Sequence, residues 1–230
     1  MTDPNQPVAY PILIRFAKTG LMRFVGHLDW QAMQQVMFLR AGLPMSIGEG
    51  PSHRLKIKTS PPTPVGVESR VEFTYVLLSE PVYPEEVMKR LQPYMPQGID
   101  VIAAKDAGFL IRKNPFGTVE AAGYNADFGR DIAPGKFDEV LAMMKLMSSK
   151  YENNPEDLVA EDIKSFWGRI IEISHEAGTV NLIVRQMEGD TFHGAKCASF
   201  LQEKLDLPHY PLFTKLDYYR LKPSRRRLFR

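Results

Sequence analysis

The sequence predicts an α+β fold made of two tandem units, each an antiparallel sheet with helices on one face. Short segments alternate apolar and polar residues, and longer segments between them repeat apolar residues at helical spacing. A related order of such segments occurs twice, on either side of residues 108–118, which contain two glycines, an asparagine and a proline. We therefore expect one unit over residues 1–112 and a second over residues 113–230.

The first unit begins with an alternating segment over residues 11–18, which indicates a half-buried strand. A helix is expected over about residues 27–41, ended by Gly42 and Pro44. The main apolar stripe of this helix consists of Leu28, Ala32, Val36 and Leu39, and it is widened by Met33 and Met37. A narrow polar stripe consists of His27, Gln31 and Gln34. The apolar stripe is the one expected to form the helix's packing face.

Two strands, a helix and a final strand complete the first unit. The strands are expected over residues 54–58 and 67–78, a helix opens at Pro84, and a last strand covers residues 99–104. The resulting order, β-α-β-β-α-β, is that of the split βαβ or ferredoxin-like unit.

The second unit repeats this arrangement with one added strand. Strands are expected over residues 118–128, 158–163, 169–175, 179–186 and 213–220, and helices over residues 134–148 and 194–205. The fold class is therefore α+β, with two ferredoxin-like units in tandem.

Composition places the chain among ordinary globular proteins, with 44% hydrophobic and 24% charged residues. Its start lacks the basic and apolar segments of a signal peptide, and no apolar run reaches the roughly 20 residues of a membrane helix. Cys197 is the single cysteine, which excludes an internal disulfide and an iron–sulfur cluster ligated by this chain alone. The histidines lack metal-ligand spacing. We expect a cytoplasmic protein with no membrane contact, metal or cofactor.

Charge is distributed unevenly along the chain. Residues 1–60 carry a net charge of +4, residues 61–214 carry −8, and residues 215–230 carry +6. Two basic ends around an acidic body suggest a polyanion site if the ends meet in space. A basic tail and ordinary surface lysines would produce the same totals.

A basic strand face is the main candidate site. Phosphate contacts are expected from Arg15, Lys18, Arg23, Arg54, Lys56 and Lys58. His53 and Phe24 could stack on unpaired bases. The structural alternative is a sheet edge whose lysines prevent aggregation.

The C-terminal tail contains the densest cluster of positive charge, which includes Arg225, Arg226 and Arg227. It could bind RNA or dock on a partner. It could also be a frayed terminus, unless Leu228 and Phe229 pack against the body of the protein.

Three motifs carry a resemblance to a known family. They are Gly-His-Leu-Asp at residues 26–29, Arg-Ala-Gly-Leu-Pro-Met-Ser at residues 40–46, and Pro-Thr-Pro-Val-Gly-Val-Glu-Ser at residues 62–69. Together they resemble the radical-SAM-linked domain of unknown function, which is fused to or encoded beside some radical SAM proteins. Two features depart from the family pattern. Gly26 stands where the family has serine, and the turn at residues 48–51 differs.

The resemblance implies a tandem α+β protein that works with a radical SAM enzyme in RNA or ribosome-related metabolism. Because one cysteine cannot supply the three-cysteine cluster motif, the radical SAM protein would act in trans. The resemblance implies a partner and a setting, but no reaction.

Three functions follow as hypotheses. The preferred one is a non-catalytic module that binds RNA, or presents it to the radical SAM partner. The second is a metal-independent endoribonuclease that uses His27 or His53 as general acid or base, by analogy with ferredoxin-like CRISPR-processing enzymes. The structural alternative for His27 is a histidine bonded to a nearby carbonyl. The third is a protein-interaction scaffold without RNA contact.

Overall fold

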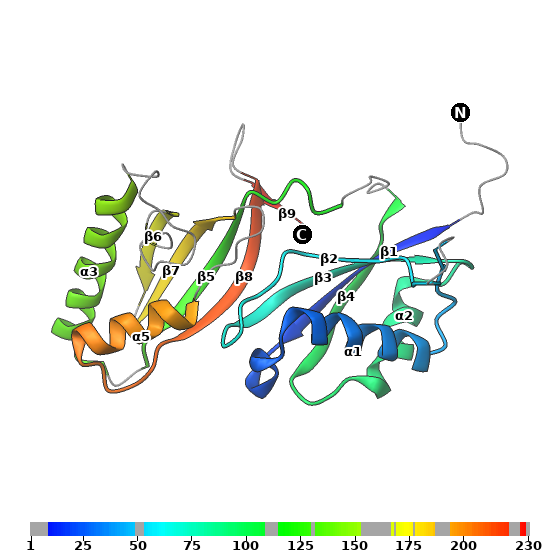
Figure 1. Cartoon of the computed structure of the whole chain (residues 1–230), viewed down its shortest axis with the longest axis horizontal. Helices are drawn as coiled ribbons and strands as arrows, with labels where there is room; N and C mark the ends of the chain where they lie inside the picture. The colour runs from blue at the N-terminus through cyan, green and yellow to red at the C-terminus, as the bar shows by residue number, and fades with distance from the viewer. Residues whose placement is uncertain are drawn as a thin grey trace. The chain divides into compact units, whose positions relative to one another are not determined.

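The structure is a computed structural model of the chain (Figure 1). It describes residues 9–48, 53–108, 115–129, 132–152, 167, 169–176, 178–186, 194–220 and 226–228. The contacts within the chain divide it into two compact units. Unit 1 comprises residues 1–62 and 71–117, and unit 2 comprises residues 63–70 and 118–230. In the described part of the chain, no helix is long and apolar enough to cross a membrane.

Unit 1 contains the elements expected from the sequence, in the expected order. They are β1 (Tyr10–Lys18), α1 (His27–Arg40), β2 (Ile57–Thr59), most of β3 (Glu68–Leu78), α2 (Pro84–Leu91) and β4 (Ile99–Asp106), with the short 3-10 helices η1 (Gly20–Phe24) and η2 (Gln92–Tyr94). The strands lie in the order β4-β1-β3-β2. β1 pairs with β4, and β2 with β3, in antiparallel fashion.

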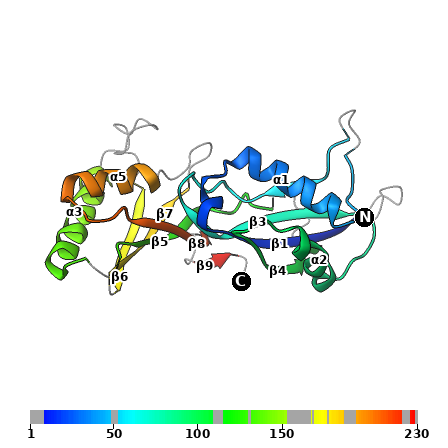
Figure 2. The same cartoon turned by 90° about the horizontal axis from the view of Figure 1, so that it is seen from below.

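The core of unit 1 lies between one face of this sheet and both α-helices. Ile12, Ile14 and Phe16 are buried on that face as expected, but Leu13 and Ala17 on the other face are buried as well, so β1 is not the half-buried strand that the sequence predicted. The helices contribute Trp30, Met37 and Phe38 from α1, and Val87 and Leu91 from α2. α1 runs beside β3 (Figure 2). Burial of these large side chains is the main stabilising term of the unit.

The prediction for the buried face of α1 was wrong for its main stripe, although Met33 and Met37, which were expected to widen that stripe, do pack in the core. The residues that face the sheet are Trp30, Gln34, Met37 and Phe38, whereas Leu28, Ala32, Val36 and Leu39 are exposed to solvent. The larger side chains Trp30 and Phe38 bury more apolar surface than the leucine and valine stripe does. The helix is therefore rotated so that its aromatic residues enter the core.

The polar stripe of α1 faces the sheet as a consequence of this rotation. Gln31 Nε2 donates to Thr59 Oγ1 at 3.0 Å, and Gln34 Nε2 donates to Thr74 Oγ1 at 2.7 Å. Gln34 Oε1 is buried and has no hydrogen-bond partner among the described residues. An unsatisfied buried acceptor costs about 1–3 kcal/mol. The two donated hydrogen bonds orient α1, but they leave the unit with a polar group that it does not satisfy.

Unit 2 also has most of its expected elements. They are β5 (Ala121–Asp127), α3 (Pro134–Glu152), β6 (Ile170–Glu176), β7 (Thr179–Arg185), α5 (Gly194–Leu205), β8 (Leu212–Arg220) and β9 (Arg226–Leu228). The strand expected over residues 158–163 lies outside the described residues. α3 and α5 lie next to each other in both views (Figure 2). Cys197 is fully buried on α5, and burial raises the pKa of its thiol well above the usual value. The thiol is therefore a neutral part of the core.

The strands of unit 2 lie in the order β8-β5-β7-β6, and neighbours in this order are antiparallel. β9 adds an antiparallel pairing to β8. The first residues of β3 belong to this unit, and Glu68 and Ser69 pair in parallel with Thr214 and Lys215. The chain thus has an α+β fold in which most strand pairs are antiparallel, as the sequence predicts.

Candidate functional site

The side chains of Arg54, Lys56 and Lys58 form a basic edge on unit 1. Leu55 and Ile57 pack against the core, so the three cations alternate onto the opposite face. Lys58 stands opposite Tyr75 in the β2–β3 pairing, and the Lys56 carbonyl accepts a hydrogen bond from Leu77 N at 3.1 Å. The strand expected over residues 54–58 is shorter and begins later, at Ile57, and Leu55 before it forms an isolated bridge with Ile47.

The basic edge is open to solvent and electrostatically uncompensated within the described residues. Arg54 and Lys58 are exposed, and Lys56 is half-buried. No hydrogen bond or ion pair joins any of the three side chains to another residue in the part of the chain that the structure describes. Three adjacent cations without an ion-pair partner among the described residues raise the local positive potential and attract anions.

Arg15 lies on the same face of the unit 1 sheet as Lys56 and Lys58. Its neighbours Ile14 and Phe16 point into the core, so Arg15 points to the other side. β3 separates β1 from β2, and Tyr75 on that strand is buried, which raises the pKa of its hydroxyl. The half-buried Arg15 therefore shares this face, with β3 between its strand and β2.

Lys18 does not belong to this surface. Its side chain is only 1% exposed, and Nζ donates to the Val25 carbonyl at 3.1 Å. A buried ammonium must be hydrogen-bonded to offset its lost hydration, and this bond ties β1 to the end of η1. The expectation that Lys18 contacts phosphate is corrected for this reason.

Arg23 and Phe24 form a pair at the end of η1. The guanidinium carbon of Arg23 lies 4.8 Å from the centre of the Phe24 ring, which is a cation–π arrangement. Phe24 is 54% exposed, so one side of its ring is accessible to a ligand. The exposed side of the Phe24 ring is flat, as stacking on an unpaired base would require.

The two candidate catalytic histidines occupy different local settings. His27 is half-buried at the first position of α1, where Gly26 is the N-cap and supplies no side-chain hydrogen bond. His53 is exposed, precedes the basic edge and has a left-handed φ of 43°. Among the described residues, no group of three or more His, Cys, Asp or Glu side chains could hold a metal ion.

The C-terminal arginines are partly described. Arg225 lies outside the described residues, whereas Arg226 and Arg227 belong to β9 and pair with Arg220 and Tyr219 of β8. The tail therefore docks on unit 2 through backbone pairing at residues 226–228. Residues 226–228 are therefore not frayed, and binding of RNA or a partner by the tail stays a prediction.

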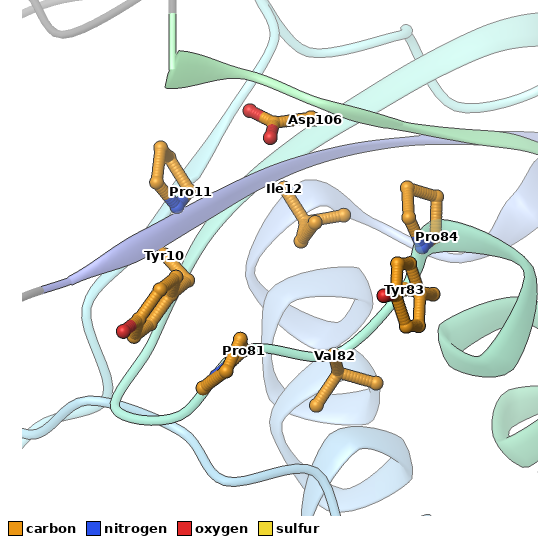
Figure 3. A pocket seen from close by; sticks show the side chains of 8 residues that line it. All are labelled: Tyr10, Pro11, Ile12, Pro81, Val82, Tyr83, Pro84 and Asp106. Carbon is orange, nitrogen blue, oxygen red and sulfur yellow. The ribbon is translucent and has the colours of Figure 1, made fainter.

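A pocket of about 300 Å³ in unit 1 was not anticipated from the sequence. Its walls are Tyr10, Pro11, Ile12, Pro81, Val82, Tyr83, Pro84 and Asp106 (Figure 3). Asp106 stands opposite Ile12 in the β1–β4 pairing, so the pocket is on the helix side of the sheet, away from the basic edge. Two tyrosines, three prolines and one carboxylate suit a flat or extended apolar group that carries a hydrogen-bond donor. The signal in the sequence is the clustering of proline with tyrosine at residues 10–11 and 81–84.

A second cavity of about 290 Å³ lies on the polar face of unit 2. Its polar walls include Glu172, Ser174, Asn181, Asp217 and Tyr219. The Tyr219 ring packs over a glycine of β5, where a Cβ atom would lie 2.9 Å from the ring. Two carboxylates, those of Glu172 and Asp217, line this cavity.

Comparison with known proteins gives a family but no activity. A search of curated proteins found no match. The model of one protein family matches residues 12–191, which include unit 1 from Ile12 onward and most of unit 2. Since this match spans well over half of the sequence, the chain belongs to the family described as an uncharacterized protein conserved in bacteria, DUF2344.

Proposed function

We propose that the protein is a non-catalytic RNA-binding module, and that the basic edge is its phosphate-contacting surface. The observation that carries the proposal is the run of three cations, Arg54, Lys56 and Lys58, without a described acidic partner. Phosphate is the common anion that such a run recognises without sequence preference. Arg15 and the exposed Phe24 ring would add a charge and a stacking surface on the same unit.

We further infer that each unit is ferredoxin-like. The support is the order of the strands in each sheet, which is β4-β1-β3-β2 in unit 1 and β8-β5-β7-β6 in unit 2. When the strands of each unit are counted from first to fourth along the chain, both orders are 4-1-3-2. A ferredoxin-like sheet leaves one face without helices, and this is the face that carries Lys56 and Lys58.

The partner is proposed to be a radical SAM protein that acts in trans. This part of the proposal rests on the resemblance of the motifs at residues 26–29, 40–46 and 62–69. Affinity capture of the intact chain before and after nuclease treatment would test it. Capture of a radical SAM protein that nuclease does not release supports direct contact, and its absence from both samples contradicts it.

Replacing all three basic-edge residues with alanine is expected to weaken RNA binding by roughly ten- to a hundredfold at low salt, because each lost cation removes a phosphate contact. Fluorescence anisotropy with a labelled structured RNA would measure the change. A matched control replaces the exposed residues Lys89, Lys145 and Lys204 with alanine, which alters the net charge equally. Equal weakening by both triple variants would contradict a localised site.

The same RNA is expected to remain intact during incubation with the protein in EDTA. The proposed role requires charge and stacking from the protein and assigns no general acid or base. Gel analysis of end-labelled RNA would detect cleavage. Cleavage that is lost in His27→Ala or His53→Ala would replace the binding role with an endoribonuclease.

A further inference from the structure

The outward face of α1 carries an apolar stripe with one exposed amide, that of Gln35, beside it. Its outer stripe consists of Leu28, Ala32, Val36 and Leu39, of which Leu28 is 79% exposed and Leu39 is 60% exposed. Isolated exposed leucines are common, but an aligned stripe on one helix is typical of an interaction surface. The stripe is therefore the strongest unexplained feature of unit 1.

The orientation of α1 is fixed by hydrogen bonds, so the stripe cannot turn inward. Gln31 and Gln34 donate to Thr59 and Thr74 on the sheet side, and Trp30 fills the core beneath the helix. Rotation that buried the leucines would break both bonds and expose the indole. The apolar stripe must be covered from outside the unit if it is to be covered at all.

The stripe is flanked by two opposite charges, one near each end of α1, so two antiparallel copies of the helix could pair them. Asp29 lies at the start of α1 and Arg40 at its end, both exposed, and neither side chain has a partner among the described residues. Eleven residues separate Asp29 from Arg40, and eleven separate Leu28 from Leu39. Eleven residues make three helical turns to within about 20° and span about 16 Å, so each pair lies along one side of the helix.

We propose that the outer stripe binds the α1 helix of a second copy of the chain, antiparallel and about a two-fold axis. Such an arrangement places Leu28 against Leu39 twice and Asp29 against Arg40 twice, with the small Ala32 near the centre to allow close approach. A surface that pairs with itself in this way is what an isologous interface requires. The inference is independent of RNA binding.

The dimer is expected to be weak and concentration-dependent. One pair of 14-residue helices buries less than the roughly 1,200–2,000 Å² of stable interfaces. Sedimentation velocity of the intact chain over a range of concentrations would show a shift from monomer to dimer. A chain that stays monomeric at every concentration overturns the proposal.

Leu28→Glu is expected to abolish the dimer, because it places a carboxylate in the apolar contact. Its matched control is Leu146→Glu, which changes a leucine that is 62% exposed on α3. Circular dichroism would verify that both variants fold. Dimerisation that survives Leu28→Glu, or that is lost equally in the control, overturns the assignment to α1.

A charge exchange tests the antiparallel register. Asp29→Arg and Arg40→Asp are each expected to weaken self-association by roughly three- to tenfold, since each creates two like-charge contacts. A mixture of the two variants restores both ion pairs, so it is expected to associate more tightly than either variant alone. A mixture no tighter than its components overturns the register.

Discussion

Replacing Trp30 with alanine is expected to lower the free energy of unfolding by about 3–5 kcal/mol. Trp30 is 1% exposed and meets Phe16 edge to face, with ring centres 5.4 Å apart and an interplanar angle of 84°. Its removal leaves a cavity that the surrounding sheet and helix cannot fill. Urea denaturation of the intact chain would measure the loss, with attention to separate transitions of the two units.

Leu28→Ala is the matched control for this prediction. Leu28 is two residues before Trp30 on the same helix, but its side chain is exposed, so a change within about 0.5 kcal/mol is expected. The pair of variants reports the rotation of α1. A larger loss for Leu28→Ala than for Trp30→Ala would mean that the apolar stripe enters the core and that the orientation described above is wrong.

Gly98→Ala is expected to destabilise the protein by about 2–4 kcal/mol. Gly98 has a φ of +88°, and an added Cβ would lie 2.6 Å from the Thr19 carbonyl oxygen. The Gly98 carbonyl also accepts a hydrogen bond from Thr19 N at 2.8 Å, next to the Lys18–Ile99 pair of the β1–β4 ladder. The methyl group would therefore strain the backbone and separate the two strands at this end.

Gly42→Ala separates the cost of the left-handed backbone from the cost of the steric contact. Gly42 has a φ of +61° after the end of α1, but nothing lies within 4 Å of an added Cβ. Only the backbone cost of about 1 kcal/mol is expected there. Thermal unfolding of both variants would show the difference. Equal effects at the two glycines would contradict the close approach of Thr19 to Gly98.

Local patterns predicted the elements of both units because their causes are local. The apolar residues Ile12, Ile14 and Phe16 of β1 share one buried face, and Pro84 opens α2 because its fixed φ suits the first helical turn. The sequence also predicted that the basic-edge side chains lie on one face, since side chains two residues apart in an extended segment share a face. Prediction succeeded where neighbours in the sequence decide the outcome.

The rotation of α1 could not be predicted, because the helix has two apolar faces. One carries Leu28 and Leu39, and the other carries Trp30 and Phe38. The choice between them depends partly on the hydrogen bonds from Gln31 to Thr59 and from Gln34 to Thr74. These threonines lie 28 and 40 residues further along the chain than the glutamines that bind them. Those contacts exist only after the sheet has formed, so helical periodicity alone pointed to the wrong face.

Lys18 and the pocket lined by tyrosines and prolines also could not be predicted, because both depend on contacts that form only in the folded chain. Lys18 looks like any strand-end lysine until η1 brings the Val25 carbonyl to its ammonium. The pocket combines the start of β1, the approach to α2 and the end of β4, which are distant in sequence. The parallel pairing of Glu68 and Ser69 with Thr214 and Lys215 likewise has no local signal.

The central claim is that the basic edge contacts phosphate, and the salt dependence of RNA binding tests it most directly. For single-stranded RNA, the slope of log affinity against log salt is about −0.7 for each phosphate neutralised. The variant lacking Arg54, Lys56 and Lys58 is therefore expected to show a slope about 2 units shallower than the wild-type chain. Identical slopes, or no RNA affinity of the wild-type chain at low salt, would contradict the claim.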